Sequence, residues 1–240
     1  MAAAQRMERV RERVAKACAR GGRRTDEVRV VAVSKTFGPE AVAALAEAGQ
    51  TVFGESRVQE AVQKVPLCPS RLEWHMVGHL QRNKVKQVVH WCSMVHSVDS
   101  VRLLQALDAA CAQAGKTMPV LLEVNLAGES SKFGLAPAAV PAVLESTGTV
   151  VHLDVIGLMT LPPYREDVEA VRPYFRELRQ RRDEWSRTIG IGLPELSMGM
   201  SHDFEVAIEE GATWIRPGTC LFRERARPKL SNDTRGSEGQ

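Results

Sequence analysis

Short apolar runs rich in β-branched residues alternate along the chain with stretches in which apolar residues recur every three or four positions. The first pattern predicts buried strands and the second predicts amphipathic helices. Eight strands are expected, at Val28–Ser34, Thr51–Phe53, Glu73–Val77, Met94–Val98, Pro119–Asn125, Leu153–Leu158, Glu195–Ser197 and Thr213–Arg216. Seven of them should be followed by a helix, at Pro39–Gly49, Ser56–Val65, His79–His90, Ser100–Gly115, Pro137–Ser146, Arg165–Thr188 and Asp203–Gly211.

This alternation predicts the fold class. Strands that alternate with helices pair in parallel through right-handed crossovers, and eight strands close a (β/α)8 barrel of the TIM type. A length of 240 residues is sufficient for one such barrel. An open doubly wound sheet is the alternative, but no G-x-G-x-x-G follows the first strand to support a dinucleotide-binding fold. We therefore predict an α/β chain that forms a TIM-type barrel.

The two ends of the chain depart from the alternation. Within Met1–Arg24 the apolar residues Met7, Val10, Val14 and Ala17 recur at helical spacing, which predicts an extra N-terminal helix packed on the barrel. The segment is also rich in arginine, as transit peptides are, but it contains Glu8 and Glu12, and transit peptides are poor in acids. Residues 1–224 are expected to form a single domain, and the polar segment 225–240 a disordered tail.

Composition narrows the class of protein. With 32 basic and 29 acidic residues, the net charge of +3 is too small to indicate a nucleic-acid-binding protein without a recognition motif. The five cysteines are widely spaced and form no C-x-x-C pair, which argues against disulfides or zinc and favours a reducing compartment, the cytoplasm. No apolar run approaches the roughly 20 residues needed to cross a bilayer, so no membrane partner is predicted.

In barrels of this type the functional site lies at the C-terminal ends of the strands. The first strand ends in Ser34-Lys35-Thr36. Side chains alternate between the two faces of a strand, so Val31, Val33 and Lys35 would share the inner face and Lys35 would point into the barrel mouth. Apolar walls around an amine lower its pKa and free the nitrogen as a nucleophile, as a Schiff base with an aldehyde requires. The alternative is a solvated lysine at a strand end.

The loops after the last two strands suit an anion. Ser201 lies at or just before the N-cap of the helix that begins near Asp203. Arg216-Pro217-Gly218-Thr219 leaves the eighth strand, where a glycine lets the backbone approach a ligand closely and Thr219 adds a hydroxyl donor. Phosphate sites in such barrels are frequently built from the loops after strands seven and eight. Ordinary turn chemistry is the alternative for each loop.

Several longer motifs resemble one known family. They are Val31-Ala32-Val33-Ser34-Lys35-Thr36, Phe53-Gly54-Glu55-Ser56-Arg57-Val58-Gln59-Glu60, Trp74-His75-Met76-Val77-Gly78-His79-Leu80-Gln81, Gly157-Leu158-Met159-Thr160 and Leu196-Ser197-Met198-Gly199-Met200-Ser201. In this order and over about Val28–Phe222, the chain looks like the pyridoxal phosphate homeostasis proteins, which are related to the barrel domain of bacterial alanine racemase.

The resemblance implies pyridoxal 5'-phosphate as the cofactor, held by Lys35 as an aldimine. It implies that the cofactor site consists of Lys35, Ser56, Met200, Ser201, Arg216, Gly218 and Thr219, with Ser201, Gly218 and Thr219 on the phosphate. Arg216 would face the pyridine nitrogen and keep it unprotonated, which makes the ring a weaker electron sink. A salt bridge to a neighbouring strand-end acid is the alternative role for Arg216. The implied function is intracellular vitamin B6 homeostasis without strong catalytic activity, with client pyridoxal phosphate enzymes as expected partners. A lone barrel without a second domain is expected to be a monomer.

Three positions depart from the family pattern. Ser56 stands where asparagine is usual, so a side-chain contact near the cofactor would be shorter or lost. Pro217 replaces an apolar residue and removes a backbone N–H, which would alter the eighth-strand ladder or the phosphate loop. Arg223 follows Phe222 where glycine is usual, which bears on the end of the fold more than on the site.

Two other functions remain open. One is an amino-acid racemase, which needs a second acid or base opposite Lys35; alanine racemase takes a tyrosine from a further β domain. This chain has only Tyr164 and Tyr174, and Tyr164, in the loop after the sixth strand, could reach the mouth. The other function is a barrel that binds a different phosphorylated metabolite and leaves the lysine unmodified.

Further candidate residues favour structural roles. The H-x-x-x-H spacing of His75 and His79 spans a strand and a loop without an evident third ligand, so no metal site is predicted, although His79 could line the mouth at the start of a helix. Glu55 and Glu129 are expected to be solvated, or paired with Arg57 and Lys132. The basic run Arg176–Arg187 also contains acids and is expected to be a solvated helix face.

Overall fold

The computed structural model describes residues 2–129 and 132–222. Its strands are β1 (Arg29–Val30), β2 (Ala32–Val33), β3 (Val52–Glu55), β4 (Glu73–Met76), β5 (Met94–Val98), β6 (Met118–Glu123), β7 (Leu153–Met159), β8 (Glu195–Met200) and β9 (Trp214–Arg216). Its α-helices are α1 (Ala3–Arg20), α2 (Pro39–Glu47), α3 (Val58–Lys64), α4 (Val85–Trp91), α5 (Val101–Gln113), α6 (Val140–Ser146), α7 (Arg172–Ile189) and α8 (Phe204–Glu209).

The sheet is a nearly closed barrel of parallel strands. Its strand order is β1-β9-β8-β7-β6-β5-β4-β3-β2, so the two end strands are separated in sequence by Val31 alone. The N–H of Val31 donates to the carbonyl of Ile215 at 2.9 Å on one side, and the N–H of Ser34 donates to the carbonyl of Gly54 at 3.0 Å on the other. One predicted strand, Val28–Ser34, is therefore divided into β1 and β2 because its two halves pair with different neighbours and close the ring.

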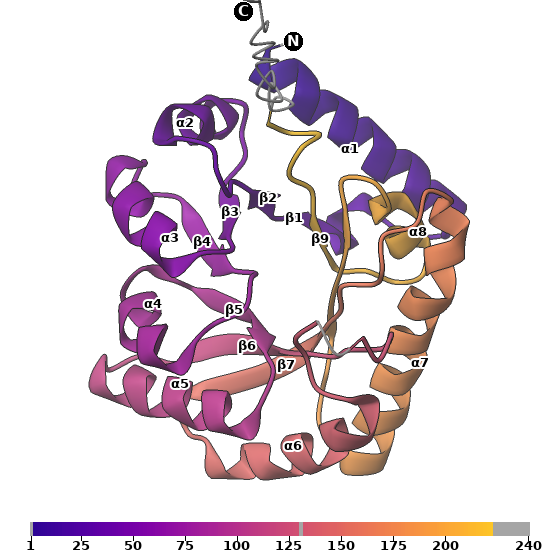
Figure 1. Cartoon of the computed structure of the whole chain (residues 1–240). Helices are drawn as coiled ribbons and strands as arrows, with labels where there is room; N and C mark the ends of the chain where they lie inside the picture. Colours follow the sequence, from indigo (N-terminus) through magenta and orange to yellow (C-terminus); the bar gives the residue numbers. More distant parts are fainter. Residues whose placement is uncertain (1, 130–131, 223–240) are drawn as a thin grey trace, which may run out of the picture.

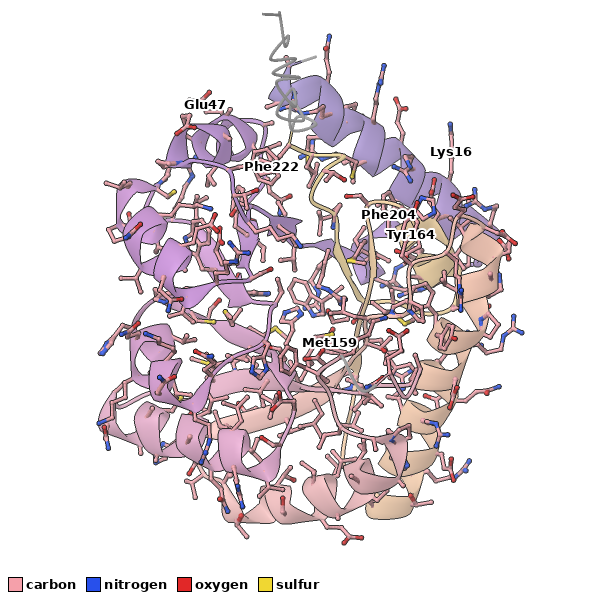
Figure 2. The ribbon with its side chains drawn as sticks, in the orientation of Figure 1. Lys16, Glu47, Met159, Tyr164, Phe204 and Phe222 are labelled. Atoms are coloured by element: carbon pink, nitrogen blue, oxygen red, sulfur yellow. The ribbon has the colours of Figure 1, made fainter. Side chains whose placement is uncertain are left out.

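Two apolar layers lie on either side of the strands. The smaller layer fills the barrel and is formed by Val31, Val33, Val77, Met94, Leu121, Met159 and Trp214. The larger layer lies between the strands and the ring of helices that surrounds them in Figure 1. Figure 2 shows Met159 near the centre of the ring of strands. Val31 and Val33 thus face the barrel interior, as the strand alternation predicts.

Helix α1 completes the outer ring. It packs against both α8 and α2, the position that a helix after β9 would occupy. Its buried face is formed by Met7, Val10, Val14, Ala17 and Cys18, which includes the face predicted from the sequence. The Arg13 guanidinium donates to Glu205 at 2.7 Å and lies 4.3 Å from the ring centroid of Phe204 on α8. The N-terminal segment is therefore part of the barrel fold.

The predicted elements recur with shifted boundaries. The helix expected at His79–His90 begins at Val85, after a 3-10 turn at Arg82–Lys84, and His79 lies in the preceding loop. Strand β8 runs to Met200, three residues past the expected end. The polar segment 225–240, Arg223 and the expected domain end at Glu224 lie outside the described residues. Within the residues described, no helix is long and apolar enough to cross a membrane.

Candidate functional site

Lys35 lies in the turn that follows β2, at the C-terminal end of the strands. Because β2 ends at Val33, the alternation of side chains does not extend to Lys35. The residue is exposed, so it is not enclosed by apolar walls as the sequence interpretation expected. Its neighbour Thr36 adopts a φ of +71°, a left-handed conformation that is uncommon for β-branched residues. The turn therefore has an unusual backbone and an accessible lysine.

A buried ion-pair cluster holds the chain before Lys35. The Lys64 ammonium on α3 donates to the carbonyl of Ser34 at 2.8 Å and to Glu55 Oε1 at 2.6 Å. The Ser34 hydroxyl donates to the same Glu55 oxygen at 2.6 Å. Lys64 and Glu55 are 5% and 0% exposed, so this pair is removed from water. It ties β2, β3 and α3 together beneath the Lys35 turn.

The cluster also reaches the residue after Lys35. Glu60 accepts from the Lys64 ammonium at 2.8 Å and from the backbone N–H of Thr36. The expectation that Glu55 is solvated or paired with Arg57 is wrong. Burial raises the pKa of Glu55, while its bonds to Lys64 and Ser34 act in the opposite direction. The second strand was expected to end at Phe53, but β3 extends to Glu55, and Lys64 on α3 covers its carboxylate.

The loops after β8 and β9 meet at the hydroxyl of Ser201. This oxygen accepts from the N–H of Gly218 at 2.9 Å and from the N–H of Cys220 at 3.3 Å. Ser201 precedes the Asp203 N-cap of α8, as predicted. A side chain at Gly218 would place its Cβ 3.2 Å from the carbonyl oxygen of Val33, so this loop lies close to the strand that leads to Lys35. Hydroxyl and backbone donors are thus gathered beside the Lys35 turn.

The other predicted site residues lie near these loops or, in the case of Ser56, after β3. Thr219 is exposed, and Met200, 38% exposed, ends β8 with its N–H donating to Asp203 at 2.6 Å. Pro217 follows the end of β9 at Arg216, and its carbonyl accepts from the N–H of Val33 at 2.9 Å. Ser56 is partly buried and its backbone packs against Gly78, where an added Cβ would lie 2.5 Å from the Ser56 oxygen.

Arg216 is a buried cation inside the barrel, with an exposed fraction of 3%. Its guanidinium donates to the Ser197 hydroxyl at 2.6 Å and to the carbonyl of Thr160 at 2.9 Å. Burial lowers the pKa of Arg216 to about 10, which leaves it charged at neutral pH. Among the described residues no carboxylate lies within ion-pairing distance of Arg216. The alternative of a strand-end salt bridge is therefore not found.

Glu123 is a buried acid at the mouth that the sequence interpretation missed. It ends β6, is 5% exposed and lines a cavity of about 180 Å³ with His79, Asn125, Phe133 and others. Burial raises its pKa to about 7, and the Arg216 cation acts against this shift. The available signal was a carboxylate at the end of the apolar run Val120-Leu121-Leu122. Its position makes Glu123 able to exchange a proton near neutral pH.

The two histidines of the H-x-x-x-H spacing point to different surroundings. His75 is completely buried inside the barrel, with its ring 5.1 Å from that of Trp214. His79 lines the mouth from a loop: its ring stacks on Phe133 at 3.5 Å, and its Nδ1 lies 3.0 Å from Asp99. Each imidazole therefore has its own partners.

The remaining candidates lie away from the mouth or in ion pairs. Tyr164 is 72% exposed and its ring lies 5.2 Å from that of His202, next to α8 (Figure 2). Glu129 pairs with Lys132 at 3.2 Å, as expected. Arginines of the basic run on α7 bind acids at the end of α8; Arg176, for example, lies 2.9 Å from Glu210. The run is therefore partly neutralised by its own fold.

Comparison with known proteins identifies relatives over nearly the whole chain. Residues 6–226 match the family described as alanine racemase, N-terminal domain. The pyridoxal phosphate homeostasis protein of Aquifex aeolicus is 46% identical over 94% of this chain and 99% of its own. The human protein of the same name is 36% identical over 90% of this chain and 84% of its own.

Solved structures agree with the sequence relatives. PipY of Synechococcus elongatus, solved with pyridoxal phosphate bound, has a TM-score of 0.81 and 34% identity, and the match covers 92% of this chain and 99% of PipY. Alanine racemase of Clostridium difficile shares the fold, with a TM-score of 0.68 at 13% identity, and the match covers 92% of this chain and 57% of the racemase. From the matched motifs, the barrel and these relatives, the chain belongs to the pyridoxal phosphate homeostasis protein family.

Proposed function

We propose that this protein binds pyridoxal 5'-phosphate at the mouth of the barrel and acts in the homeostasis of that cofactor. One observation carries the proposal: the Lys35 turn, the loop donors at Ser201 and Gly218, and the cation of Arg216 all stand at the C-terminal ends of neighbouring strands. The bound cofactor would supply an aldehyde that reacts with an amine and a pyridine ring that draws electrons.

The residues present suit the three parts of such a molecule. The hydroxyls of Ser201 and Thr219 would hold the phosphate together with the backbone N–H of Gly218, which would turn from the Ser201 oxygen to the ligand. Several hydrogen-bond donors at short distance suit such an anion. Close contact between Gly218 and Val33 explains why a larger residue would crowd this loop. Lys35 would provide the amine, and Arg216 a permanent donor for the ring nitrogen. Ser56 and Met200 would complete the contacts from the neighbouring strand ends.

We infer a role as a carrier of the cofactor without strong catalytic activity. Two-base racemisation would need an acid or base facing Lys35. Tyr164 is largely exposed beside His202, and the cavity that Glu123 lines does not include Lys35 among its lining residues. The accessible position of Lys35 suits release of the cofactor to client enzymes. A monomer is the simplest form of this carrier, because the barrel and α1 already enclose both apolar layers. The free cysteines support a location in a reducing compartment, the cytoplasm.

The test is borohydride trapping on Lys35→Ala, with Lys86→Ala as a control at an exposed lysine on α4. We expect wild type and Lys86→Ala to develop a yellow absorbance with pyridoxal phosphate. Reduction should then add the cofactor mass to the Lys35 peptide. Lys35→Ala should give neither signal. A colourless wild type, or trapping that persists in Lys35→Ala, would contradict the proposal and favour another phosphorylated ligand.

The same samples separate a carrier from a racemase. We expect no conversion of L-alanine to its enantiomer above the rate of free pyridoxal phosphate, as measured by chiral chromatography. Transfer of the cofactor to an apo-aminotransferase should restore that enzyme's activity. Robust racemisation that is lost in Lys35→Ala would replace the carrier role with the enzymatic one.

A further inference from the structure

A continuous chain of hydrogen bonds crosses the barrel interior and ends at Arg216. Glu73 Oε1 lies 3.0 Å from His75 Nε2, and His75 Nδ1 lies 3.0 Å from His96 Nε2. His96 Nδ1 lies 2.8 Å from the Ser197 hydroxyl, which accepts from Arg216 at 2.6 Å. The chain passes from β4 through β5 and β8 to β9. Its interior members are buried, whereas the Glu73 side chain is 49% exposed.

The direction of these bonds follows from the two ends. Arg216 can only donate, so Ser197 accepts from it and has one hydroxyl hydrogen left. Among the described residues, His96 Nδ1 is the acceptor within reach of that hydrogen. A neutral His96 then donates from Nε2 to His75 Nδ1. In the reverse direction, the Ser197 hydrogen would have no acceptor in the described part of the chain.

The Glu73 end of the chain requires the same direction of hydrogen-bond donation. A neutral His75 that accepts at Nδ1 carries its hydrogen on Nε2 and donates it to the Glu73 carboxylate, which only accepts when ionised. The bond from His75 lowers the pKa of Glu73, and burial together with the nearby Arg216 cation keeps the pKa of His96 well below its ordinary value. A second cation is thus disfavoured next to Arg216. Both histidines are expected as neutral Nε2–H tautomers.

An aromatic ring packs against both histidines of the hydrogen-bond chain. The rings of His75 and His96 lie 5.0 Å apart, and the ring of Trp214 lies 5.1 Å and 6.1 Å from them. Trp214 belongs to the apolar layer that fills the barrel. In such a setting an unmade hydrogen bond costs the full desolvation of the group, so each member of the chain restrains the next.

We propose that the chain Glu73–His75–His96–Ser197 is a positioning device for Arg216, which sets the orientation of the guanidinium toward the barrel mouth. The proposal rests on the proposed function in assigning Arg216 to the cofactor ring. A change at Glu73, which lies at the end of the barrel opposite the mouth, would therefore alter the orientation of the Arg216 guanidinium. Its members are positioning residues, because each acts on the site through Arg216.

The first test uses the protein without cofactor. Imidazole ¹⁵N spectra at pH 7 should show His75 and His96 as neutral Nε2–H tautomers, assigned with His75→Gln and His96→Gln. Ser197→Ala should shift the His96 Nδ1 resonance and the Arg216 side-chain N–H resonances. Ser97→Ala should leave them unchanged; Ser97 is an equally buried serine on β5 that donates instead to the Gly78 carbonyl. An Nδ1–H tautomer or a positive charge on His75 or His96 at pH 7 would overturn the proposal.

The second test measures cofactor binding. We expect Ser197→Ala to weaken pyridoxal phosphate binding about tenfold, the equivalent of one lost hydrogen bond to a charged group. The absorbance maximum of the bound cofactor should shift as well. Ser197→Thr, which keeps a hydroxyl, should restore both. Glu73→Gln, at a half-exposed position, should shift the maximum in the same direction as Ser197→Ala, because a neutral amide accepts the His75 hydrogen more weakly than a carboxylate does.

Different results would refute the proposed function and the positioning role of the hydrogen-bond chain. If wild type binds no pyridoxal phosphate but both tautomers are found and Arg216 responds to Ser197→Ala, the proposed function fails and the positioning chain stands. If the cofactor binds but Ser197→Ala and Glu73→Gln leave its affinity and absorbance at wild-type values, the positioning role is refuted while the proposed function survives.

Discussion

Glu123 keeps its carboxyl group in an environment with little water and has the Arg216 cation as a partial compensation. Its pKa rises from the ordinary 4.5 to about 7 because burial disfavours the charged form. The folded protein therefore holds this proton more tightly than the unfolded chain does. The resulting stability is fully present below about pH 4.5 and is lost as the pH rises through about 7.

Glu123→Gln should remove this pH dependence. The variant is expected to be more stable than wild type at pH 8, by on the order of 3 kcal/mol, and to differ little at pH 5. Urea unfolding of both proteins from pH 5 to 8 measures the difference. Parallel stability curves over this range would show that Glu123 does not carry the shifted proton.

Lys64 compensates a buried carboxylate beneath the Lys35 turn. Lys64→Met would leave Glu55 charged and unpaired at 0% exposure, so we expect a loss of about 3–5 kcal/mol in unfolding free energy. Removing both charges in Lys64→Met/Glu55→Gln should lose less than the single variant. Denaturant titration of wild type, Lys64→Met and the double variant measures the three unfolding free energies. A double variant that is less stable than Lys64→Met would show that charge compensation is not the role of Lys64.

At the scale of elements, β7 and β8 bring the two partners of Arg216 together. Gly157 pairs with Glu195 across these strands, and a Cβ at Gly157 would lie 1.9 Å from the Glu195 carbonyl oxygen. The two backbones can therefore approach only because position 157 has no side chain. The same pairing sets the position of Thr160 and Ser197, which both accept from Arg216.

Gly157→Ala should force β7 and β8 apart. We expect a loss of about 3 kcal/mol or more in stability, because the clash involves backbone atoms that cannot rotate away. Gly148→Ala is the matched control, since an added Cβ there meets no atom within 4 Å. Thermal and urea unfolding measure both. Equal stability of the two variants would contradict the close approach of these strands.

At the scale of the whole molecule, helix α1 closes the ring of helices between α8 and α2 (Figure 1). The end of the described chain joins this closure, because Arg6 on α1 donates to the carbonyl of Leu221 at 2.5 Å and Phe222 stacks on Phe37 with ring centroids 4.8 Å apart. Residues at the two ends of the described sequence thus cover the same side of the barrel. Stability of the barrel should depend on α1 as on any other helix of the ring.

Val10→Ala tests the contribution of α1. Val10 is 1% exposed, so the loss of two buried methyl groups should lower the unfolding free energy by about 2 kcal/mol. Arg9→Ala, at an exposed position of the same helix, should change it by less than about 0.5 kcal/mol. Chemical denaturation gives both values. An unaffected Val10→Ala would mean that α1 folds independently of the barrel.

The sequence by itself determined the alternation of strands and helices, the inner face of the first strand and the buried face of α1. These features are local, because hydrophobic periodicity reports which side of one element is covered. The sequence also placed Ser201 and Gly218 on adjacent loops, since consecutive parallel strands end at the same side of a barrel. Its motifs indicated the family, which the relatives confirmed.

The tertiary structure alone decided which polar groups meet. The first strand divides because it pairs on both sides, Glu55 is buried because α3 covers it, and Lys35 is exposed because the strand ends before it. His96 and Ser197 are 101 residues apart in sequence, yet their side chains bond across the barrel. Periodicity cannot specify such contacts, because they depend on closure of the whole ring. The hydrogen-bond chain to Arg216 is therefore a property of the closed barrel.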